Sequence, residues 1–470
     1  MPTPKSTMTN PSVMVFVDHD IIVRNFLQKD LLDSMAASFS ITFVVPPKGY
    51  KDGSRISQDL DLIGLPGKLV YLEPVQKRLN LWSHLRTISR LKPSLDQFSK
   101  HIRQITLARL SRIGRIIYPI LALPGIFRVY ESLMVRIIES HPYSTLEQLI
   151  LDCRAQLIFH PTVMNGVYVH DLVGISKKLS IPLLLAMNSW DNVAGRRYLA
   201  TNPDWLIVWG KQTFSHAKTL MGMPEDRIKR FGAPQLDIYK TQSTITRETF
   251  CSRHNLSSDK LIILYAGSSK GVDEYSHLEF LEQLIRKTYS DSVRVIYRPH
   301  PWGGAGKNGH RILNNRWDFV ELERSSLDYL KNIQMGLSHR SYPKLENARD
   351  TLYSVDAVIS PLSTILIEAA LCGKPSMCFI PSDEDSKHLA ITAPLRHFQE
   401  IYDSPDFLVA YNTHELEELF DELLQRAKDP TTRTRMIKAT EYFIESTPEP
   451  YSKSLVNLIN AIHNTNDASR

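Results

Sequence analysis

Residues 358–375 combine hydroxyl and carboxyl side chains in a pattern that suits a nucleotide site. The segment passes from the apolar pair Val358-Ile359 through a polar turn into an apolar helical stretch, which predicts a strand, a turn and a helix. Ser363 and Thr364 fall at the expected helix start, where backbone N–H groups and the helix dipole favour a phosphate oxygen. Glu368, about one turn further on, suits a ribose hydroxyl. The alternative is an ordinary N-cap, which explains one hydroxyl but not both.

Two other expected strands in the second half of the chain end in groups that could contact a ligand. One ends in Ala266-Gly267-Ser268, where small residues allow a close approach to the backbone, although a plain β-turn explains this stretch on its own. Another ends in Arg298-Pro299-His300-Pro301, where two prolines hold a histidine that can donate to phosphate, or that is merely structural. The candidate nucleotide-binding residues are Gly267, Ser268, Arg298, His300, Ser360, Ser363, Thr364 and Glu368.

The first half of the chain offers groups for acid–base chemistry. The first expected strand ends in Asp18-His19-Asp20, any of which could act as a base on an acceptor hydroxyl; the alternative is that Asp20 caps the next helix. The same three residues read as a D-x-D metal motif, as does 383–385, but we predict no metal and expect 383–385 to be a solvated loop. The candidate catalytic residues are Asp18, His19, Asp20 and Asp191.

Two further strand ends in the first half suit substrate contact. One reads Phe159-His160-Pro161-Thr162, and the other reads Asn188-Ser189-Trp190-Asp191-Asn192, in which the Trp ring could stack on a sugar. A turn with an Asx hydrogen bond explains each residue singly, whereas the set favours a substrate site. The candidate substrate-binding residues here are His160, Asn188 and Trp190.

Elements that would position these groups alternate along the chain. Continuous apolar runs, which are typical of parallel strands covered on both faces, alternate with helical stretches. We therefore expect an α/β fold of two doubly wound Rossmann-like domains with an interdomain cleft. The expected boundaries are 1–240 for the first domain, 241–258 for a polar linker, 259–445 for the second domain and 446–470 for a C-terminal helix. The expected strands are 13–17, 41–45, 68–72, 155–159, 182–187, 205–209, 261–265, 293–297, 357–359, 377–380 and 407–411.

Charge is unevenly distributed over the 470 residues. The net charge is +6, but residues 77–115 hold ten basic residues and one acid, so this segment is +9 and the remainder is −3. It opens a helical insertion expected at about 77–140, whose charges are either simply solvated or meet an anionic lipid surface. We expect no signal peptide, no membrane span and four reduced cysteines, hence a cytoplasmic protein that is peripheral at the inner membrane face. Nucleic acid is not an expected partner.

Residues 298–301 and 356–375 resemble the nucleotide-binding half of GT-B glycosyltransferases that build bacterial surface polysaccharides. The pattern is similar to that of sialyltransferases, Kdo transferases and CDP-glycerol glycerophosphotransferases, over roughly 260–380. The resemblance implies a GT-B enzyme that moves a sugar from a nucleotide-sugar co-substrate, CMP-linked or linked to uridine or guanosine, to a glycan or lipid-linked acceptor, with no metal or other cofactor. It implies that His300, Ser363 and Thr364 hold the donor phosphates and that Glu368 holds the ribose.

Other readings of the chain stay open. A CDP-glycerol-type phosphotransferase and a nucleotide-sugar 2-epimerase share the expected fold. Fold alone does not fix function, so the chain could also be a non-catalytic, membrane-associated nucleotide-binding protein.

Overall fold

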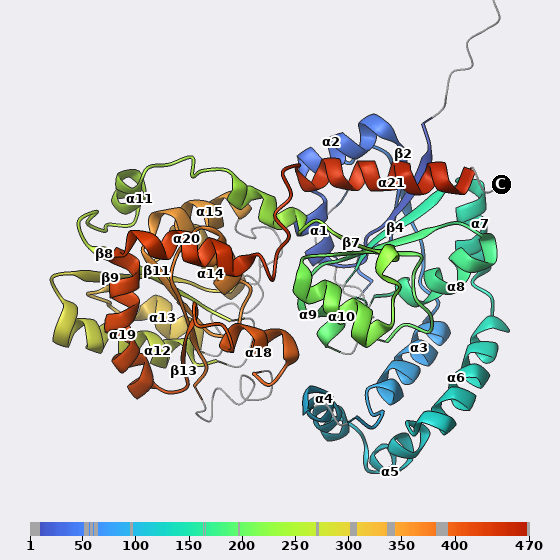
Figure 1. Cartoon of the computed structure of the whole chain (residues 1–470), viewed down its shortest axis with the longest axis horizontal. Helices are drawn as coiled ribbons and strands as arrows, with labels where there is room; N and C mark the ends of the chain where they lie inside the picture. The colour runs from blue at the N-terminus through green and yellow to red at the C-terminus, as the bar shows by residue number, and fades with distance from the viewer. Residues whose placement is uncertain are drawn as a thin grey trace, which may run out of the picture. The chain divides into compact units, whose positions relative to one another are not determined.

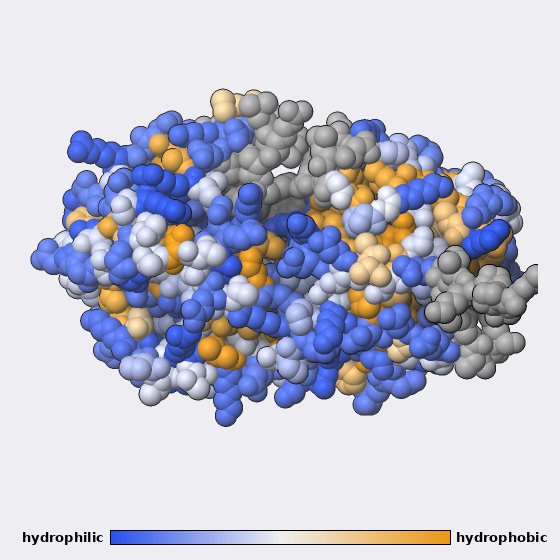
Figure 2. Space-filling model, turned by 90° about the horizontal axis from the view of Figure 1, so that it is seen from above, coloured by the Kyte–Doolittle hydropathy of each residue, from blue (hydrophilic) through white to orange (hydrophobic). Residues whose placement is uncertain are grey.

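The chain divides into two compact units, one made of residues 1–235 and 444–470 and the other of residues 236–443 (Figure 1). On the face seen in Figure 2, hydrophobic residues lie among hydrophilic ones on both units. The computed structural model describes residues 10–50, 56, 60, 64–94, 97–162, 164, 166–195, 198–268, 272–300, 308–335, 344–381 and 393–467.

The first unit is built on a seven-stranded parallel sheet in the order β3-β2-β1-β4-β5-β6-β7. Its five inner strands are largely apolar and buried because helices cover both faces, as the continuous apolar runs predict, whereas the edge strands β3 and β7 are partly exposed. The structure confirms the expected strands and adds β7, whose three residues are too short for a periodic signal. The strands are β1 Ser12–Phe16, β2 Ser40–Val45, β3 Lys68–Tyr71, β4 Leu157–Thr162, β5 Leu183–Met187, β6 Trp205–Val208 and β7 Ile228–Arg230.

Helices of the first unit include one from the far end of the chain. Helix α21 (Tyr451–Asp467) packs on α2 (Lys29–Ser38) and buries Tyr451, Leu455 and Ile459 in the core of this unit. The C-terminal helix, which we expected as a segment of its own, is therefore part of the first unit. The other helices outside the insertion are α1 Asp20–Phe26, α7 Ser144–Asp152, α8 Val169–Leu179, α9 Asp191–Ala194, α10 Lys211–Met221 and the 3₁₀ turn η2 Glu225–Arg227.

The helical insertion forms its own small core beside the sheet. Its helices are α3 (Gln76–Ser89), α4 (Gln97–Ala108), α5 (Arg112–Leu121) and α6 (Pro124–Glu139), which lie together in Figure 1. Trp82, Leu85 and Ile88 of α3 pack against Phe127 and Ile138 of α6. Among the described residues, no single helix has the length and apolar character to cross a membrane; α5 and α6 reach that threshold only as a pair, which is bent by 99°.

Arg78 anchors the insertion to the sheet domain. Its Nε and Nη2 donate to Asp171 Oδ1 of α8 at 2.9 and 2.8 Å, and its Nη1 donates to the carbonyls of Ile138 and His141. Trp82 Nε1 donates to the same carboxylate oxygen at 2.6 Å. One of the ten basic residues of 77–115 is thus a buried structural group.

The second unit repeats the winding pattern with six parallel strands in the order β10-β9-β8-β11-β12-β13. The expected strands are again confirmed, and the three-residue edge strand β10 was missed. The strands are β8 Leu261–Ala266, β9 Val293–Arg298, β10 Val320–Leu322, β11 Ala357–Ser360, β12 Ser376–Phe379 and β13 Leu408–Ala410. The helices are α11 Arg247–Arg253, α12 Glu274–Leu284 with the π-helical turn η4 Ile285–Tyr289, α13 Gly309–Asn314, α14 Arg324–Gln334, α15 Leu345–Ser354, α16 Ile365–Leu371, α18 Arg396–Tyr402, α19 Thr413–Lys428 and α20 Pro430–Thr440.

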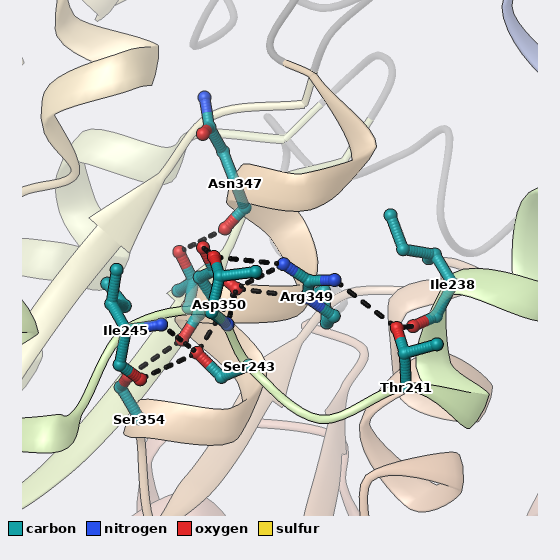
Figure 3. Close-up of polar contacts among 10 residues, drawn as sticks. Ile238, Thr241, Ser243, Ile245, Asn347, Arg349, Asp350 and Ser354 are labelled. Atoms are coloured by element: carbon teal, nitrogen blue, oxygen red, sulfur yellow. Dashed lines mark hydrogen bonds and ion pairs between the residues drawn. The ribbon is translucent and has the colours of Figure 1, made fainter. Parts of the chain in front are cut away.

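Residues 241–258, which we expected to be a linker, are a packed part of the second unit. The segment follows the 3₁₀ turn η3 (Pro234–Lys240) and contains α11, which packs on α15. Ser243 Oγ and Thr244 Oγ1 each donate to the Asp350 carboxylate at 3.1 Å, and Arg349, which forms an ion pair with Asp350, donates to Thr241 Oγ1 at 3.2 Å (Figure 3). Several polar side chains of this segment form hydrogen bonds with α15, so polar composition alone does not identify a linker here.

Candidate functional site

Both sheets have a point at which the winding direction reverses. In the first unit it lies between β1 and β4, and in the second it lies between β8 and β11, because later strands are added on opposite sides of these pairs. Ligands of open α/β sheets bind beyond the carboxyl ends of the strands at such points. The predicted site residues therefore fall at the carboxyl ends of the parallel strands, in one place in each unit. We call this place the edge of that unit.

The edge of the second unit contains a buried carboxylate that the sequence did not reveal. Glu274, the first residue of α12, is 1% exposed. Its carboxylate accepts a hydrogen bond from Ser268 N–H at 2.9 Å and another from the Tyr297 hydroxyl. A Cβ on Gly267 would overlap the Glu274 carboxylate, so a side chain at this position would displace that group. The small residue that suggested ligand access thus makes room for Glu274.

Burial changes the acid chemistry of Glu274. Removal from water raises the pKa of Glu274 to about 7, and the hydrogen bonds from Tyr297 and Ser268 only partly oppose that rise. The same carboxylate, together with burial, holds the pKa of the Tyr297 hydroxyl well above its ordinary value. Glu274 is therefore a carboxyl group that exchanges its proton close to neutral pH.

A second buried carboxylate, Glu323, lies at the start of α14 beside Arg298. Its oxygens accept from the backbone N–H and hydroxyl groups of Ser325 and Ser326, at 2.6 to 3.0 Å. Burial alone would raise the pKa of Glu323, but the His254 ring 3.9 Å away, the Arg298 charge and the hydrogen bonds from the two serines lower it to about 2. Arg298 is itself 6% exposed, so a buried positive charge lies near enough to Glu323 to lower the pKa of that carboxyl group.

Ser363 and Thr364 are half-buried at the turn between β11 and α16. Thr364 occupies the N-cap position of α16 but makes no side-chain capping hydrogen bond. The ordinary-cap alternative is therefore not what the structure has, and both hydroxyls are available to a ligand. Because α16 has only seven residues, its dipole is weak, and the two hydroxyls rather than the dipole would bind a phosphate. His300 is half-buried just after strand β9, which lies two places from β11 in the sheet.

Two other predicted ligand contacts already have partners within the second unit. Ser360 is fully buried, and its hydroxyl donates to the Ala266 carbonyl at 2.9 Å, which ties β11 to β8. Glu368 accepts from the Tyr239 hydroxyl at 2.6 Å, so one of its oxygens holds η3 against α16. Glu368 remains half-exposed and retains a second oxygen for a ligand.

At the edge of the first unit, Asp18 and His160 form a buried pair. Asp18 Oδ2 accepts from Val167 N–H at 2.9 Å and lies 3.6 Å from His160 Nε2. Burial by itself raises the pKa of Asp18, but the charge and hydrogen bond of His160, the charge of His19 and the Val167 N–H lower it below its ordinary value. A Cβ on Gly166 would lie 2.0 Å from the same oxygen. Asp18 is thus a fixed negative charge.

His19, and not Asp20, caps helix α1. His19 Nδ1 accepts from Ile21 N–H at 3.1 Å, so in the neutral ring the proton is on Nε2. This leaves His19 a hydrogen-bond donor rather than a ready base. Asp20 is 4% exposed, whereas His19 is half-exposed.

The residues after β5 divide into buried and accessible groups. Asn188 is 1% exposed, and neither end of its amide has a hydrogen-bond partner among the described residues. A buried amide in this state calls for a ligand or a water. Trp190 is 2% exposed, which argues against the sugar stacking that we expected, since its ring is covered. Asp191 is half-exposed and accepts from Asn192 Nδ2 at 3.3 Å.

Within the described residues, His, Cys, Asp and Glu side chains nowhere form a group that could hold a metal ion. Residues 383–385, the other acidic triplet, lie outside the described residues.

Solved structures share this fold at low sequence identity. A structure described as that of a UDP-N-acetylglucosamine 2-epimerase from Listeria monocytogenes has a TM-score of 0.52 at 11% identity, covering 98% of each chain. MnaA from S. aureus, in a structure with UDP, has a TM-score of 0.51 at 14% identity, covering 97% of each chain. The wall teichoic acid polymerase TagF reaches 0.49 at 11% identity, over 97% of this chain and 90% of that one.

No protein-family model matches the sequence, and a search of curated proteins finds no match. The L. monocytogenes and S. aureus structures, both with TM-scores above 0.5, establish the fold. The two parallel sheets of this chain agree with it, since their strands follow the same order in both units. The chain has the GT-B architecture that its sequence resemblance implied.

Proposed function

We propose that this chain is a GT-B transferase that takes a group from a nucleotide-linked donor for surface polysaccharide synthesis. The observation that carries the proposal is the set of groups at the winding reversal of the second unit. Arg298 and His300 end one strand, and the hydroxyls of Ser363 and Thr364 follow a strand two places away in the sheet. A guanidinium, an imidazole and two hydroxyls are the hydrogen-bond donors that a diphosphate needs.

The nucleotide is the part of the donor with the most support. The S. aureus protein of similar fold was determined with UDP, which supports a nucleotide ligand for this chain as well. Glu368 has a second carboxylate oxygen that could accept from a ribose hydroxyl. We keep cytidine, uridine and guanosine as candidate bases and propose a glycan or lipid-linked acceptor.

We assign the acceptor-side base to Asp191. In an inverting transfer, the acceptor hydroxyl must lose a proton as the new bond forms. Asp18 is buried with its charge committed to His160 and Val167 N–H, and His19 presents a donor. Asp191 is the half-exposed carboxylate of the four candidates. Replacing it with asparagine should abolish transfer while leaving nucleotide binding unchanged.

A thermal-shift panel of CMP, CDP, UDP and GDP tests the donor site. At a ligand concentration of about 100 times Kd, binding stabilises the folded state by about 3 kcal/mol. We expect one nucleotide to give the largest rise in Tm, His300→Ala to reduce that rise, and His414→Ala, an exposed histidine on α19, to leave it intact. If no nucleotide raises Tm, or if both variants respond as wild type does, the assignment is wrong.

The hydroxyl pair allows a sharper test because it makes no capping bond. Replacing a Thr that caps a helix with Ala usually costs about 1 kcal/mol. Here Ser363→Ala with Thr364→Ala should leave the unliganded Tm unchanged and still reduce the nucleotide-induced rise. A drop in the unliganded Tm without a change in nucleotide response would assign the pair a structural role instead.

A nucleotide-sugar 2-epimerase is the second candidate, because a protein described by that activity has a similar fold. The chain also has two buried carboxyl groups whose pKa values lie far apart, Glu274 at about 7 and Glu323 at about 2, as an acid–base pair requires. Incubation with a nucleotide sugar and no acceptor separates the candidates: an epimerase inverts C2 of the donor, whereas a transferase needs an acceptor. Nucleotide binding without either reaction would indicate the non-catalytic alternative.

A further inference from the structure

Helices α5 and α6 expose an unusual concentration of aliphatic side chains. Eight of the fifteen exposed large hydrophobic residues in the described chain fall between 113 and 133. None of the eight is aromatic or polar, and two of them, Ile113 and Val129, are exposed by 70% and 73%. We call this set the aliphatic face; it consists of Ile113, Ile116, Ile117, Ile120, Leu123, Ile126, Val129 and Leu133.

The aliphatic face is separate from the faces that hold these helices in the fold. In α6, the buried residues Phe127, Met134 and Ile138 recur at helical spacing and pack on α3. Ile126 and Val129 occupy a second stripe of the same helix, displaced from the first, and are exposed. The residues of the aliphatic face therefore take no part in this core, and their concentration on two consecutive helices is typical of an interaction surface.

The charge around the aliphatic face is strongly positive. Residues 97–139 contain seven Lys or Arg and two Glu, a net charge of +5. Arg112 and Arg136, both exposed, lie on α5 and α6 next to the aliphatic stripes. Arg115, by contrast, donates to the carbonyls of Leu107, Leu110 and Ala108 and so closes the end of α4. An apolar surface with basic flanks is complementary to an anionic lipid bilayer.

The geometry favours lying on a bilayer over crossing it. The ten residues of α5 span about 15 Å and the sixteen of α6 about 24 Å, both short of the roughly 30 Å of hydrocarbon. Their 99° bend leaves no straight path through a membrane. Side chains such as Ile116 and Val129 can instead enter the outer hydrocarbon while the arginines meet phosphate groups.

We propose that the aliphatic face docks this chain on an anionic phospholipid bilayer. The face lies on the insertion and not at the candidate donor site, so docking and nucleotide binding can fail independently. The residues that enter the bilayer are the aliphatic ones of 113–133, whereas the basic residues of 77–115 supply only part of the attraction.

Vesicle co-sedimentation of the full chain tests this proposal. We expect binding to vesicles that contain phosphatidylglycerol, weaker binding to pure phosphatidylcholine, and a decrease with added salt. Ile116→Ser with Val129→Ser should lower the partition coefficient at least about tenfold, since each side chain loses a burial contribution. Arg112→Gln with Arg136→Gln should lower it about 25-fold on anionic vesicles only, or about fivefold for each charge.

Leu151→Ser with Leu220→Ser is the matched control, because both leucines are exposed on the same unit but outside the aliphatic face. The control variant should bind vesicles as wild type does. Equal binding by the control and the Ile116/Val129 variant would overturn the proposal, as would an absence of vesicle binding. If the Ile116/Val129 changes instead convert a dimer to a monomer without altering vesicle recovery, the face binds a second copy of the chain, and the bilayer proposal is wrong.

Discussion

Replacing Glu274 with glutamine should remove a loss of stability that the wild-type chain suffers as pH rises. Glu274 is buried with a pKa near 7 in the folded chain, against an ordinary value of 4.5 in the unfolded chain. Between these two values the folded state keeps the proton and the unfolded state loses it. The contribution of Glu274 to stability is therefore complete below pH 4.5 and is lost as pH rises through about 7.

The size of the effect follows from the difference in pKa. About 2.5 units at 1.36 kcal/mol per unit give about 3 kcal/mol. Glutamine is a close isostere of the protonated acid, because its oxygen can accept from Ser268 N–H and its NH₂ group can donate to the Tyr297 oxygen. Glu274→Gln should thus match wild type near pH 4 and exceed it by up to about 3 kcal/mol near pH 8.5.

Denaturant unfolding at the two pH values measures this difference. Taking variant minus wild type cancels other groups that titrate over the range, and hydrogen exchange of β8 and β9 assigns the change to the second unit. Glu279→Gln, at an exposed position on the same helix, is the control for loss of a charge. If wild type and Glu274→Gln lose stability in parallel as pH rises, Glu274 is not a buried acid that retains its proton, and the account of this edge is wrong.

Three further changes test the first unit. Burial lowers the pKa of His170 to about 3, so the folded chain loses stability as pH falls below 6.5. In denaturant unfolding, His170→Phe should remove about 2 kcal/mol of the stability loss between pH 6.5 and 4.5. Gly166→Ala should lower stability by about 1 to 3 kcal/mol, seen as a lower Tm, because its Cβ would overlap the Asp18 carboxylate. Arg78→Met should cost about 3 to 5 kcal/mol on unfolding by leaving Asp171 buried and unpaired, and Arg78→Met with Asp171→Asn should recover part of it.

The sheets could be predicted because their signal is local. Runs such as Val13–Val17 and Leu261–Tyr265 are apolar throughout, and only a strand covered on both faces tolerates that pattern over so few residues. Strands β7 and β10 have three residues each and leave no such run. The sequence also does not reveal the break between α1 and α2, because apolar residues continue at helical spacing across Leu27 and Gln28, where the helix is interrupted.

The site was predicted less completely because burial of a polar group depends on distant residues. Glu274 reads in sequence as an ordinary acid in the first turn of a helix, and nothing local shows that Gly267 and Tyr297 enclose it. Trp190 looks like an exposed ring among polar neighbours, yet it is buried. The positions of Ser363 and His300 were predictable, since they depend only on where a strand ends.

A carboxylate packed beside a glycine occurs at both edges, with opposite consequences for the charge of that carboxylate. In each unit a carboxylate fills the space that a glycine leaves, Asp18 beside Gly166 and Glu274 beside Gly267. Neighbouring groups lower the pKa of Asp18 and keep it negative, whereas burial raises the pKa of Glu274 until it is largely neutral below pH 7. A donor phosphate would be repelled by Asp18 at the first edge, whereas at the second it would meet Arg298 and Glu323, with little further negative charge from Glu274 below pH 7. This asymmetry supports our proposal that the nucleotide binds in the second unit and the neutral acceptor hydroxyl in the first.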